Sequence, residues 1–539
     1  MTRPIYFLGL LVSCTSISSA FPDELPDPAK IENDGAVIGE IILERSDVFD
    51  LSDPEENNWL YRLANKLHIV TRENVIRKQL LLESGDAYSK KLSDESERLL
   101  RQNSYLFDAD ILPVSRNEGV VDLVVKTRDV WTLGPDISAS RTGGENTSRI
   151  GIEELNFLGL GQSIRVFHEE GVERRSDSIE FFDRQLGNSW TSGFAHFADN
   201  SDGHHRQLSL VRPFYSLDAR WSLGGSAIDN ERRGLFYRLG NQAAEYQQYL
   251  DYGSLWGGWS AGLRDGWVKR WQAGVVFSDL RFSDVTNPAL PALIPANRKL
   301  VYPFVSLEIL EDRYVTAANR DQIGRTEDFH TGTRFTATLG WSDERFEADR
   351  DALIWSSTFS RGFGDLDKQF LMLGAAASGR HESGRSANSR ASFTARYYKV
   401  QSEKRLFYAT LSATAGHALD VDNLVELGGD SGLRGYPLRY QAGESKLLFT
   451  IEQRYFTDWY PFRLVRVGGA IFADAGRVWG DNPINETRYG WLTDVGFGLR
   501  LGRTRSSSGK MIHIDVAFPL GGDASIDDVQ FLLESKRSF

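Results

Sequence analysis

From Trp131 onward apolar and polar residues alternate with a period of two, most clearly near the end of the chain, whereas long loops and Gly-rich runs blur the alternation between 170 and 400. In the stretch 491–501, one face carries aromatic and aliphatic side chains and the other carries acidic, basic and glycine residues. The same alternation recurs in 446–456 and 511–518. This period predicts β-strands, because successive side chains of a strand point to opposite faces of the sheet.

Each of these predicted strands has one apolar face and one face that carries charge. A soluble β-sandwich would bury the apolar face and leave the charges in water. A transmembrane barrel inverts this arrangement, with apolar side chains towards lipid and charged side chains towards a polar lumen. The length of the β region and aromatic residues at strand ends, which suit membrane interfaces, favour the barrel. These aromatic residues are Trp459, Tyr460, Trp479 and Tyr489.

A Gly-rich run at 428–432 leads into the tetrapeptide Leu433-Arg434-Gly435-Tyr436. Five strands are predicted after it, at 444–456, 464–479, 488–502, 510–519 and 527–539. Five is odd, so this loop and a periplasmic C-terminus lie on opposite sides of the membrane. An even total then requires an odd number of strands before the loop. Eleven strands, at roughly 27 residues for each strand with its loop, give a sixteen-stranded antiparallel barrel over 130–539.

Residues 37–129 predict a small α+β domain. Thr71 can cap a helix whose apolar residues fall close to one face, and Gly85 suits its end. Ser93 opens a second helix with acidic residues in its first turn. The predicted order is strand Val37–Glu44, helix Thr71–Glu83, helix from Ser93, strand Leu106–Val114 and strand Val120–Lys126.

Residues 1–20 predict a secretory signal peptide, with Arg3 before a short apolar core and small residues ahead of Phe21. Residues 21–36 are rich in Pro and Asp and are expected to form a linker. The single cysteine is Cys14, so a chain cleaved after residue 20 has no disulfide. The alternative is a lipoprotein signal, because Leu11-Val12-Ser13-Cys14 resembles a lipoprotein cleavage box with Cys14 as the lipidated residue.

Charge and local motifs narrow the classes of function. The chain has 539 residues and a formal net charge of −12, which argues against a nucleic-acid partner. No Gly-rich phosphate loop with Lys is present, and no cofactor is expected. Gly258-Trp259-Ser260-Ala261-Gly262 matches a hydrolase nucleophile elbow, but its flanks predict a β stretch where that elbow needs a helix. His204-His205 lacks a third ligand at a recognised spacing, so no metal site is expected.

Four short motifs occur in a fixed order along the chain: Gly85-Asp86-Ala87-Tyr88, Asn156-Phe157-Leu158-Gly159-Leu160-Gly161, Leu433-Arg434-Gly435-Tyr436 and Phe472-Ala473-Asp474-Ala475-Gly476. With them, the chain resembles the outer-membrane barrel-assembly and two-partner-secretion transporter superfamily, also called the bacterial surface antigen family. Its members pair periplasmic polypeptide-transport-associated (POTRA) domains with a sixteen-stranded barrel. The resemblance implies one POTRA domain at 37–129, where other members carry two or more.

The resemblance also assigns the motifs. Asn156, Gly159 and Gly161 would form an early periplasmic turn. Leu433, Gly435 and Tyr436 would frame an arginine loop that folds back into the lumen, although Leu433 stands where the family has Val or Ile. Alternation points Glu452, Asp474 and Asp494 inward, and the resemblance selects Glu452 and Asp474 as the partners of Arg434. Such a buried guanidinium needs carboxylates to offset its desolvation.

The function implied is non-enzymatic insertion or translocation of unfolded polypeptides at the bacterial outer membrane. The POTRA domain would capture a client by strand addition. A seam between residues 131–141 and 527–539 would then open to admit it. Expected partners are outer-membrane or secreted polypeptides, outer-membrane lipid and periplasmic accessory proteins. Two alternatives remain open, a passive channel or receptor with a merely structural loop, and a two-partner-type secretion pore; an outer-membrane hydrolase rests on Ser260 alone.

Overall fold

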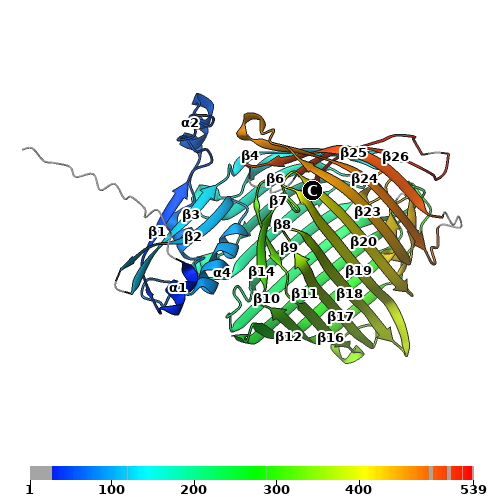
Figure 1. Cartoon of the computed structure of the whole chain (residues 1–539). Helices are drawn as coiled ribbons and strands as arrows, with labels where there is room; N and C mark the ends of the chain where they lie inside the picture. The colour runs from blue at the N-terminus through cyan, green and yellow to red at the C-terminus, as the bar shows by residue number, and fades with distance from the viewer. Residues whose placement is uncertain are drawn as a thin grey trace, which may run out of the picture.

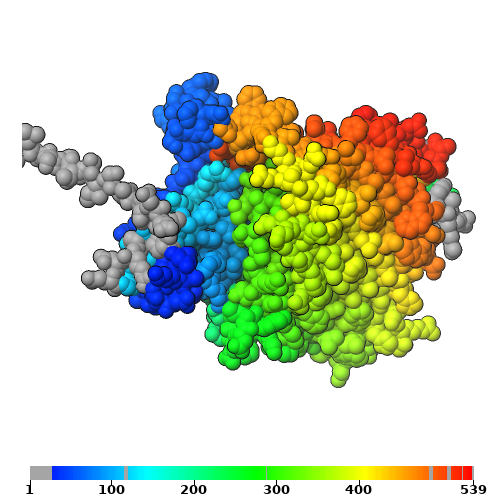
Figure 2. Space-filling view, viewed as in Figure 1, coloured from blue at the N-terminus to red at the C-terminus, as the bar shows by residue number. Residues whose placement is uncertain are grey.

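A small α+β domain lies against one end of a large closed β-barrel (Figure 1). The computed structural model describes residues 27–117, 119–286, 288–484, 490–506, 511–524 and 526–536. The predicted signal peptide, Cys14 and Tyr489 lie outside these residues. The space-filling view shows the domain packed directly on the barrel (Figure 2). We call the barrel end that carries the domain the proximal end and the opposite end the distal end.

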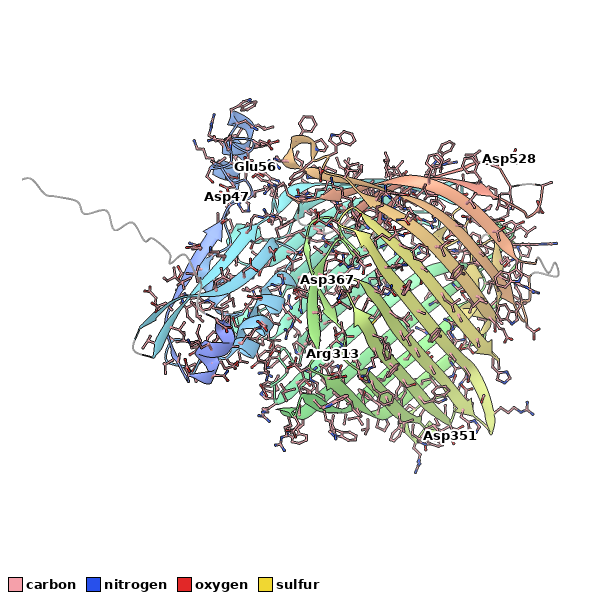
Figure 3. All side chains as sticks on the ribbon, in the orientation of Figure 1. Asp47, Glu56, Arg313, Asp351, Asp367 and Asp528 are labelled. Carbon is pink, nitrogen blue, oxygen red and sulfur yellow. The ribbon has the colours of Figure 1, made fainter. Side chains whose placement is uncertain are left out.

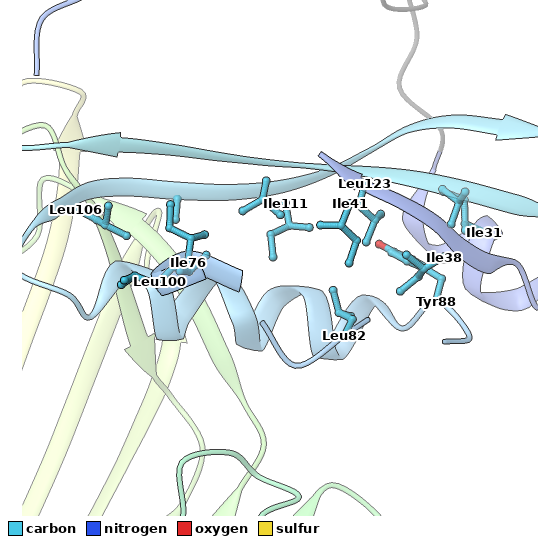
Figure 4. Packing of buried hydrophobic residues seen from close by; sticks show 14 of the residues in the cluster. Ile31, Ile38, Ile41, Ile76, Leu82, Tyr88, Leu100, Leu106, Ile111 and Leu123 are labelled. Carbon is cyan, nitrogen blue, oxygen red and sulfur yellow. The ribbon is translucent and has the colours of Figure 1, made fainter. Parts of the chain in front are cut away.

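The N-terminal domain has a three-stranded sheet in the order β1-β3-β2, with β1 parallel and β2 antiparallel to β3. Helices pack on one face of this sheet around a core that includes Ile38, Ile41, Ile76, Leu100 and Leu123 (Figure 4). In chain order the elements are α1 (Pro28–Asn33), β1 (Val37–Ser46), α2 (Trp59–Leu67), α3 (Glu73–Arg77), α4 (Lys90–Arg101), β2 (Leu106–Asn117) and β3 (Val120–Asp129).

The helices of this domain differ from the prediction, whereas its three strands lie where they were expected. The first predicted helix shortens to α3, because the backbone N–H of Leu81 turns away to the hydroxyl of Ser96. Thr71 is not a helix cap: its N–H and hydroxyl both donate to Asp129. The second helix begins three residues before Ser93, at Lys90. Helix α1 lies within the expected linker, and α2 was not predicted.

The barrel contains twenty strands among the described residues, not the sixteen predicted. They are β4 (Leu133–Thr142), β5 (Glu145–Glu154), β6 (Gln162–Glu170), β7 (Arg175–Asp183), β8 (Ser192–Asn200), β9 (Gly203–Arg212), β10 (Trp221–Arg238), β11 (Asn241–Arg264), β12 (Trp267–Ser283), β13 (Arg298–Glu311), β16 (Arg334–Ser342), β17 (Ala352–Asp365), β18 (Gln369–Glu382), β19 (Arg385–Ser402), β20 (Arg405–His417), β23 (Ser445–Phe456), β24 (Val465–Trp479), β25 (Leu492–Arg503), β26 (Met511–Pro519) and β27 (Gln530–Lys536). Two hairpins stand apart from this wall: β14 (Tyr314–Ala318) with β15 (Thr326–His330), and β21 (Val425–Leu427) with β22 (Gln441–Gly443).

The error in the strand count lies wholly before the arginine loop. The five strands predicted after it are present as β23 to β27. The predicted spacing of 27 residues was too wide, because β4 to β9 are only 9 or 10 residues long and are joined by short turns. The number of strands before the loop is still odd, so the predicted side of the loop is unaffected.

The wall has the inverted polarity that the alternation predicts. On β25, Val495, Phe497 and Leu499 are exposed on the outside, whereas Asp494 and Arg500 are almost fully buried within the barrel. Charged side chains are therefore sequestered from the outer surface, and apolar ones cover it. No helix in the described part of the chain is long and apolar enough to cross a membrane.

The barrel closes at a thin seam between its last and first strands. Among the described residues, which end at Lys536, β27 and β4 share a single residue pair, Leu533 with Arg141. The preceding pair of strands, β26 and β27, shares seven. Within the described ranges, the ladder of main-chain hydrogen bonds is thus much shorter at this junction than at the preceding one.

Candidate functional site in the barrel lumen

The segment 418–444, which we call the distal loop, joins β20 to β23 at the distal end and folds back into the barrel. Two short 3-10 helices, Val421–Asn423 and Gly429–Ser431, and the β21–β22 ladder shape it. Its tip buries Leu433, Tyr436 and Tyr440 completely, in a cluster with apolar residues of β24 and β25. The loop therefore carries its own apolar core into the lumen, and this core fixes where its arginine lies.

Arg434 contacts two carboxylates of the barrel wall. Its Nε and Nη2 donate to the two oxygens of Asp474 at 2.8 and 3.0 Å, and its Nη1 donates to Glu452 Oε1 at 2.8 Å. The guanidinium also lies over the ring of Phe472, 3.3 Å from the centroid. The three residues of the predicted lock are thus in direct contact, with a bidentate geometry that lysine could not reproduce.

The neighbours of Arg434 tie the loop tip to the next wall strand. Gly435 donates its N–H to Asp494 Oδ2 at 3.0 Å, and a Cβ at this position would lie 2.7 Å from Asp494 Cβ. The hydroxyl of Tyr436 is within hydrogen-bond distance of the carbonyls of Thr493 and Gly521, at 2.9 and 2.8 Å. Glycine is required at 435 because the backbone passes too close to the wall for a side chain.

Arg434 and its two carboxylate partners belong to a larger cluster of buried charged residues, whose members on the barrel wall lie on β23 to β26. Arg454 donates to the second oxygen of Glu452 at 2.9 Å, and Arg500 pairs with Asp515. Burial alone would lower the pKa of Arg434, but Asp474 and Glu452 raise it above its usual value, so the guanidinium stays charged. The cluster comprises Arg434, Arg454, Arg500, Glu452, Asp474, Asp494 and Asp515.

The distal loop also touches the first hairpin of the barrel. Gly143, in the turn between β4 and β5, has a positive φ, and a Cβ there would lie 2.3 Å from the backbone nitrogen of Leu438. A Cβ on Gly429 would lie 2.8 Å from the Cα of the same Gly143. One loop therefore contacts strands on both sides of the β27–β4 seam.

A second segment enters the lumen from the other end. Residues 312–333, which we call the proximal hairpin, leave the wall after β13, form β14 and β15, and rejoin it at β16. At its tip, Arg320 Nε donates to the carbonyl of Leu366 at 2.8 Å, and the Tyr398 hydroxyl donates to Asp321 at 3.0 Å. Ile323 packs in an apolar cluster with residues of several wall strands.

The base of the proximal hairpin is bonded to the N-terminal domain. Arg101 of α4 makes a bidentate pair with Asp328, at 2.9 and 2.7 Å. Thr326 donates to Asp108 of β2 at 2.7 Å, and Arg98 lies over the ring of Tyr314. Figure 1 shows β14 beside α4. The hairpin thus connects the domain to the interior of the barrel.

The two inserted segments meet at Arg454. Its Nη1 donates to the carbonyl of Arg320 in the proximal hairpin at 2.8 Å, while its Nε donates to Glu452, which holds Arg434 of the distal loop. A continuous polar path therefore runs from Arg101 in the domain, through the hairpin, to the distal loop. This path was not predicted, although Asn319 and Gly324 between two β-rich runs are a hairpin signal.

The early turn motif lies at the junction between domain and barrel. Asn156 donates to the Thr71 hydroxyl at 2.8 Å and accepts the N–H of Gly161 at 2.7 Å. Gly159 and Gly161 have positive φ, and a Cβ on Gly159 would lie 2.8 Å from the carbonyl oxygen of Val70. The motif is therefore a docking turn, shaped so that the domain can approach it closely.

The weaker candidate residues of the sequence are placed elsewhere. Ser260 is buried within β11, and its Oγ accepts the N–H of Gly262 at 3.0 Å. The chain continues there as a strand, so a nucleophile elbow is excluded. His204 and His205 lie on β9 and bond to Asp229 and Asn230. Within the described ranges, no group of three His, Cys, Asp or Glu residues could hold a metal ion.

A closed barrel with an apolar outer face and a charged lumen entered by loops defines an outer-membrane β-barrel protein. The chain is similar, more narrowly, to a protein of Treponema pallidum (strain Nichols) whose name marks it as a candidate outer membrane protein assembly factor. The two are 30% identical over 133 residues, which cover 23% of this chain and only 16% of that protein. No family model matches the chain.

Several solved structures align with most of the chain. BamA from Haemophilus ducreyi lacking POTRA domains 1–3 aligns over 93% of this chain and 84% of its own, with 14% identity and a TM-score of 0.39. CdiB from Acinetobacter baumannii aligns over 93% and 74%, with 13% identity and a TM-score of 0.41. CdiB from Escherichia coli aligns over 93% and 76%, with 12% identity and a TM-score of 0.43.

Proposed function

We propose that this protein inserts or translocates polypeptides at the outer membrane, without a chemical step of its own. In this proposal the N-terminal domain is a POTRA domain that captures an extended client segment. Its sheet order, β1-β3-β2, leaves β1 and β2 as outer strands, and an outer strand is the element to which a peptide adds by main-chain hydrogen bonds.

The observation that carries the proposal is the seam. Among the described residues, the junction of β27 with β4 has one residue pair and that of β26 with β27 has seven, so the barrel would separate between β27 and β4 at the lower cost. Separation exposes two strand edges inside the membrane, where unsatisfied main-chain groups are costly. A client strand would satisfy those edges, which provides the driving force for its entry.

The distal loop is the proposed latch of this seam. Arg434 holds β23 and β24, Gly435 holds β25, and the loop body packs on the turn between β4 and β5. Because these contacts lie on both sides of the seam, release of the loop would free the last strands from the first. The loop-to-wall lock of Arg434, Glu452 and Asp474 would thus act in client entry as well as in stability.

The competing function is a passive channel. Two inserted segments occupy the lumen and are bonded to each other through Arg454, which favours a closed barrel that opens on demand over a permanently open pore. The similarity to an assembly factor supports the same choice. Whether clients are inserted into the membrane or secreted across it depends on which proteins are affected when the seam is blocked.

The test is a disulfide across the seam. Cys14 is the single cysteine of the chain, so Arg141→Cys with Leu533→Cys introduces a defined cysteine pair where the described residues of β27 and β4 pair. Oxidation should abolish client insertion or secretion, and reduction should restore it. The matched control is Ile514→Cys with Leu533→Cys, which joins β26 to β27 and should leave function intact. Full function with an oxidised seam would overturn the proposal.

Bacteria that carry the Arg141→Cys with Leu533→Cys variant can also identify the clients. With the seam oxidised, a census of outer-membrane and secreted proteins distinguishes the two modes. Loss of many barrel proteins indicates assembly, and loss of a single secreted protein indicates a two-partner-type pore. A changed ion conductance with no change in either class indicates a passive channel.

A further inference from the structure

Helix α2 exposes an apolar stripe that the domain does not use. The helix is inserted between β1 and α3 and leaves Trp59 and Leu67 70% and 64% exposed. Leu60 and Leu63 are also exposed. At helical spacing these four positions fall within one arc of about 100°. A soluble domain of this size would normally bury such a stripe, so its exposure calls for a partner.

The opposite side of α2 packs against the N-terminal domain and the barrel rim, so the apolar stripe faces outward. Tyr61 is buried and stacks on Phe49, with ring centroids 4.1 Å apart, and its hydroxyl bonds to the carbonyl of Phe462. Asn65 donates to the Phe49 carbonyl at 2.8 Å. Arg505, just after β25, donates to the Val48 carbonyl at 2.7 Å and pairs with Glu56 (labelled in Figure 3).

The barrel turn that holds α2 is itself apolar and exposed. It joins β23 to β24 at the proximal end, and Trp459 and Phe462 are 66% and 80% exposed. Phe462 and Arg463 adopt positive φ, a strained conformation for residues with side chains, which directs Phe462 outward. Figure 1 shows α2 beside this turn and away from the body of the domain.

A groove continues the stripe onto the outer wall of the barrel. It has a volume of about 540 Å³ and lies between α2 and the barrel rim, where it is lined by Leu63, Leu67, Trp131, Leu464 and Val465. Val465 begins β24 on the same side of that strand as the exposed Ile471. The groove is therefore continuous with the surface that faces lipid.

The polar edge of α2 carries only positive charge. Arg62 and Lys66 are exposed on the edge of the apolar stripe, and the helix contains no acidic residue. Apolar and aromatic residues on one face with Lys or Arg beside them are typical of helices that lie in the plane of a membrane interface, where cations meet lipid phosphates.

We propose that α2 lies in the periplasmic leaflet of the outer membrane, with phospholipid acyl chains on its apolar stripe and in the groove. This placement ties the N-terminal domain to the bilayer as well as to the barrel. It does not depend on whether the barrel handles polypeptides. A protein partner and a second copy of this chain are the other candidate occupants.

The test uses the full-length protein in vesicles of phosphatidylethanolamine and phosphatidylglycerol. An environment-sensitive fluorophore is attached to Leu63→Cys on the stripe, to Lys66→Cys on its edge, or to Asp94→Cys on the exposed side of α4. Nitroxides on the acyl chains should quench Leu63→Cys strongly, with a blue shift of its emission and protection from iodide. Lys66→Cys should respond to nitroxides at the headgroup, and Asp94→Cys to iodide alone.

A second variant separates lipid contact from misfolding. Leu60→Asn with Leu67→Asn, in the Leu63→Cys background, should lose the acyl-chain quenching while the barrel keeps its heat-modifiable mobility on gels. Iodide access to Leu63→Cys in vesicles would overturn the proposal. Protection from iodide without acyl-chain quenching would also overturn it and would favour a second copy of the chain as the occupant.

Discussion

Two segments enter the barrel from opposite ends, and they are held in different ways. The distal loop is fixed by a buried guanidinium with two carboxylates and by its own apolar core. The proximal hairpin is held at its tip by main-chain carbonyls, apolar contacts and two longer ion pairs, Arg320 with Asp367 and Asp321 with Arg396. Its bidentate charge pair, Asp328 with Arg101, lies at its base, on the N-terminal domain. The distal loop is therefore bound to the wall, and the hairpin is bound between wall and domain.

Because of this difference, loss of its contacts should affect the barrel differently for each of the two segments. Breaking the distal contacts leaves uncompensated charge inside the barrel and should destabilise the wall itself. Breaking the base of the hairpin leaves partly solvated groups at the domain interface and should release only the hairpin. The contrast can be tested by one substitution in each segment, compared by global and local measurements.

The largest effect is expected for Arg434→Ala. Glu452 and Asp474 would be left buried without their cation, which typically costs about 3–5 kcal/mol. The temperature at which the barrel loses its heat-modifiable mobility on gels should fall markedly, although export continues. Arg434→Lys keeps the charge but not the bidentate pair and should recover only part of the loss. An unchanged transition temperature for Arg434→Ala would contradict the proposal that Arg434, Glu452 and Asp474 stabilise the barrel.

A smaller and local effect is expected for Arg101→Ala. It removes the bidentate pair with Asp328, and hydrogen bonds to charged groups contribute about 1.5–3 kcal/mol. Backbone amides of residues 314–330 should exchange faster with solvent, while barrel melting stays close to that of the parent. The matched control is Arg77→Ala, whose pair with Glu73 is exposed. If Arg101→Ala lowers barrel melting as much as Arg434→Ala, the proposed distinction between the segments is wrong.

The proximal hairpin should also loosen as pH rises. Burial raises the pKa of Glu327 from its usual range to about 7, so the folded hairpin favours the protonated carboxyl. The stabilisation is fully present below the unfolded pKa near 4.5 and is lost as pH rises through about 7. Because the side chain keeps some contact with solvent, the change in stability of the hairpin should be about 2 kcal/mol.

Hydrogen exchange of residues 319–325, corrected for intrinsic rates, measures this dependence between mildly acidic and neutral pH. Glu327→Gln mimics the protonated carboxyl and should abolish the pH dependence while keeping the hairpin docked. A pH dependence that persists in Glu327→Gln would contradict the assignment to Glu327.

The smallest effect is expected for Ser260→Ala. Its Oγ accepts one backbone N–H inside β11, so its removal should cost about 1 kcal/mol of stability and change no function. Esterase or protease activity that disappears in this variant would restore the hydrolase alternative. Ser222→Ala, another buried serine of the same wall, provides the control for general effects of cavity formation.

The distal loop was predictable because its signals are local. A guanidinium within a Gly-rich run, followed by strands whose alternation points Glu452 and Asp474 inward, restricts its partners to a few carboxylates of the lumen. The polarity of β25 and the five strands after the loop were predictable for the same reason. The period of the strands narrows the partners of Arg434 to Glu452, Asp474 and Asp494, and the family resemblance selects the first two.

The proximal hairpin and α2 were not predictable in this way. The partner of Asp328 is Arg101, 227 residues away, and no periodicity links them. The apolar stripe of helix α2 faces outward, so the spacing of its apolar residues does not indicate packing into a core. The strand count failed because spacing between strands is set by turns, and β4 to β9 have shorter turns than the average that was assumed.

The proximal hairpin imposes an order on the folding of the barrel itself. It lies inside the wall yet is bonded to a domain at the other end of the sequence, so the wall cannot close first and admit it later without breaking contacts such as Arg454 with Arg320. The strand pairings of the N-terminal domain join residues much closer in sequence than the pairing of β27 with β4, which closes the longest loop of any described strand pairing in the barrel wall and is therefore slow. The domain, once folded, can hold the hairpin as a template around which the later strands are laid down, and closure of the barrel becomes the last step of its own assembly.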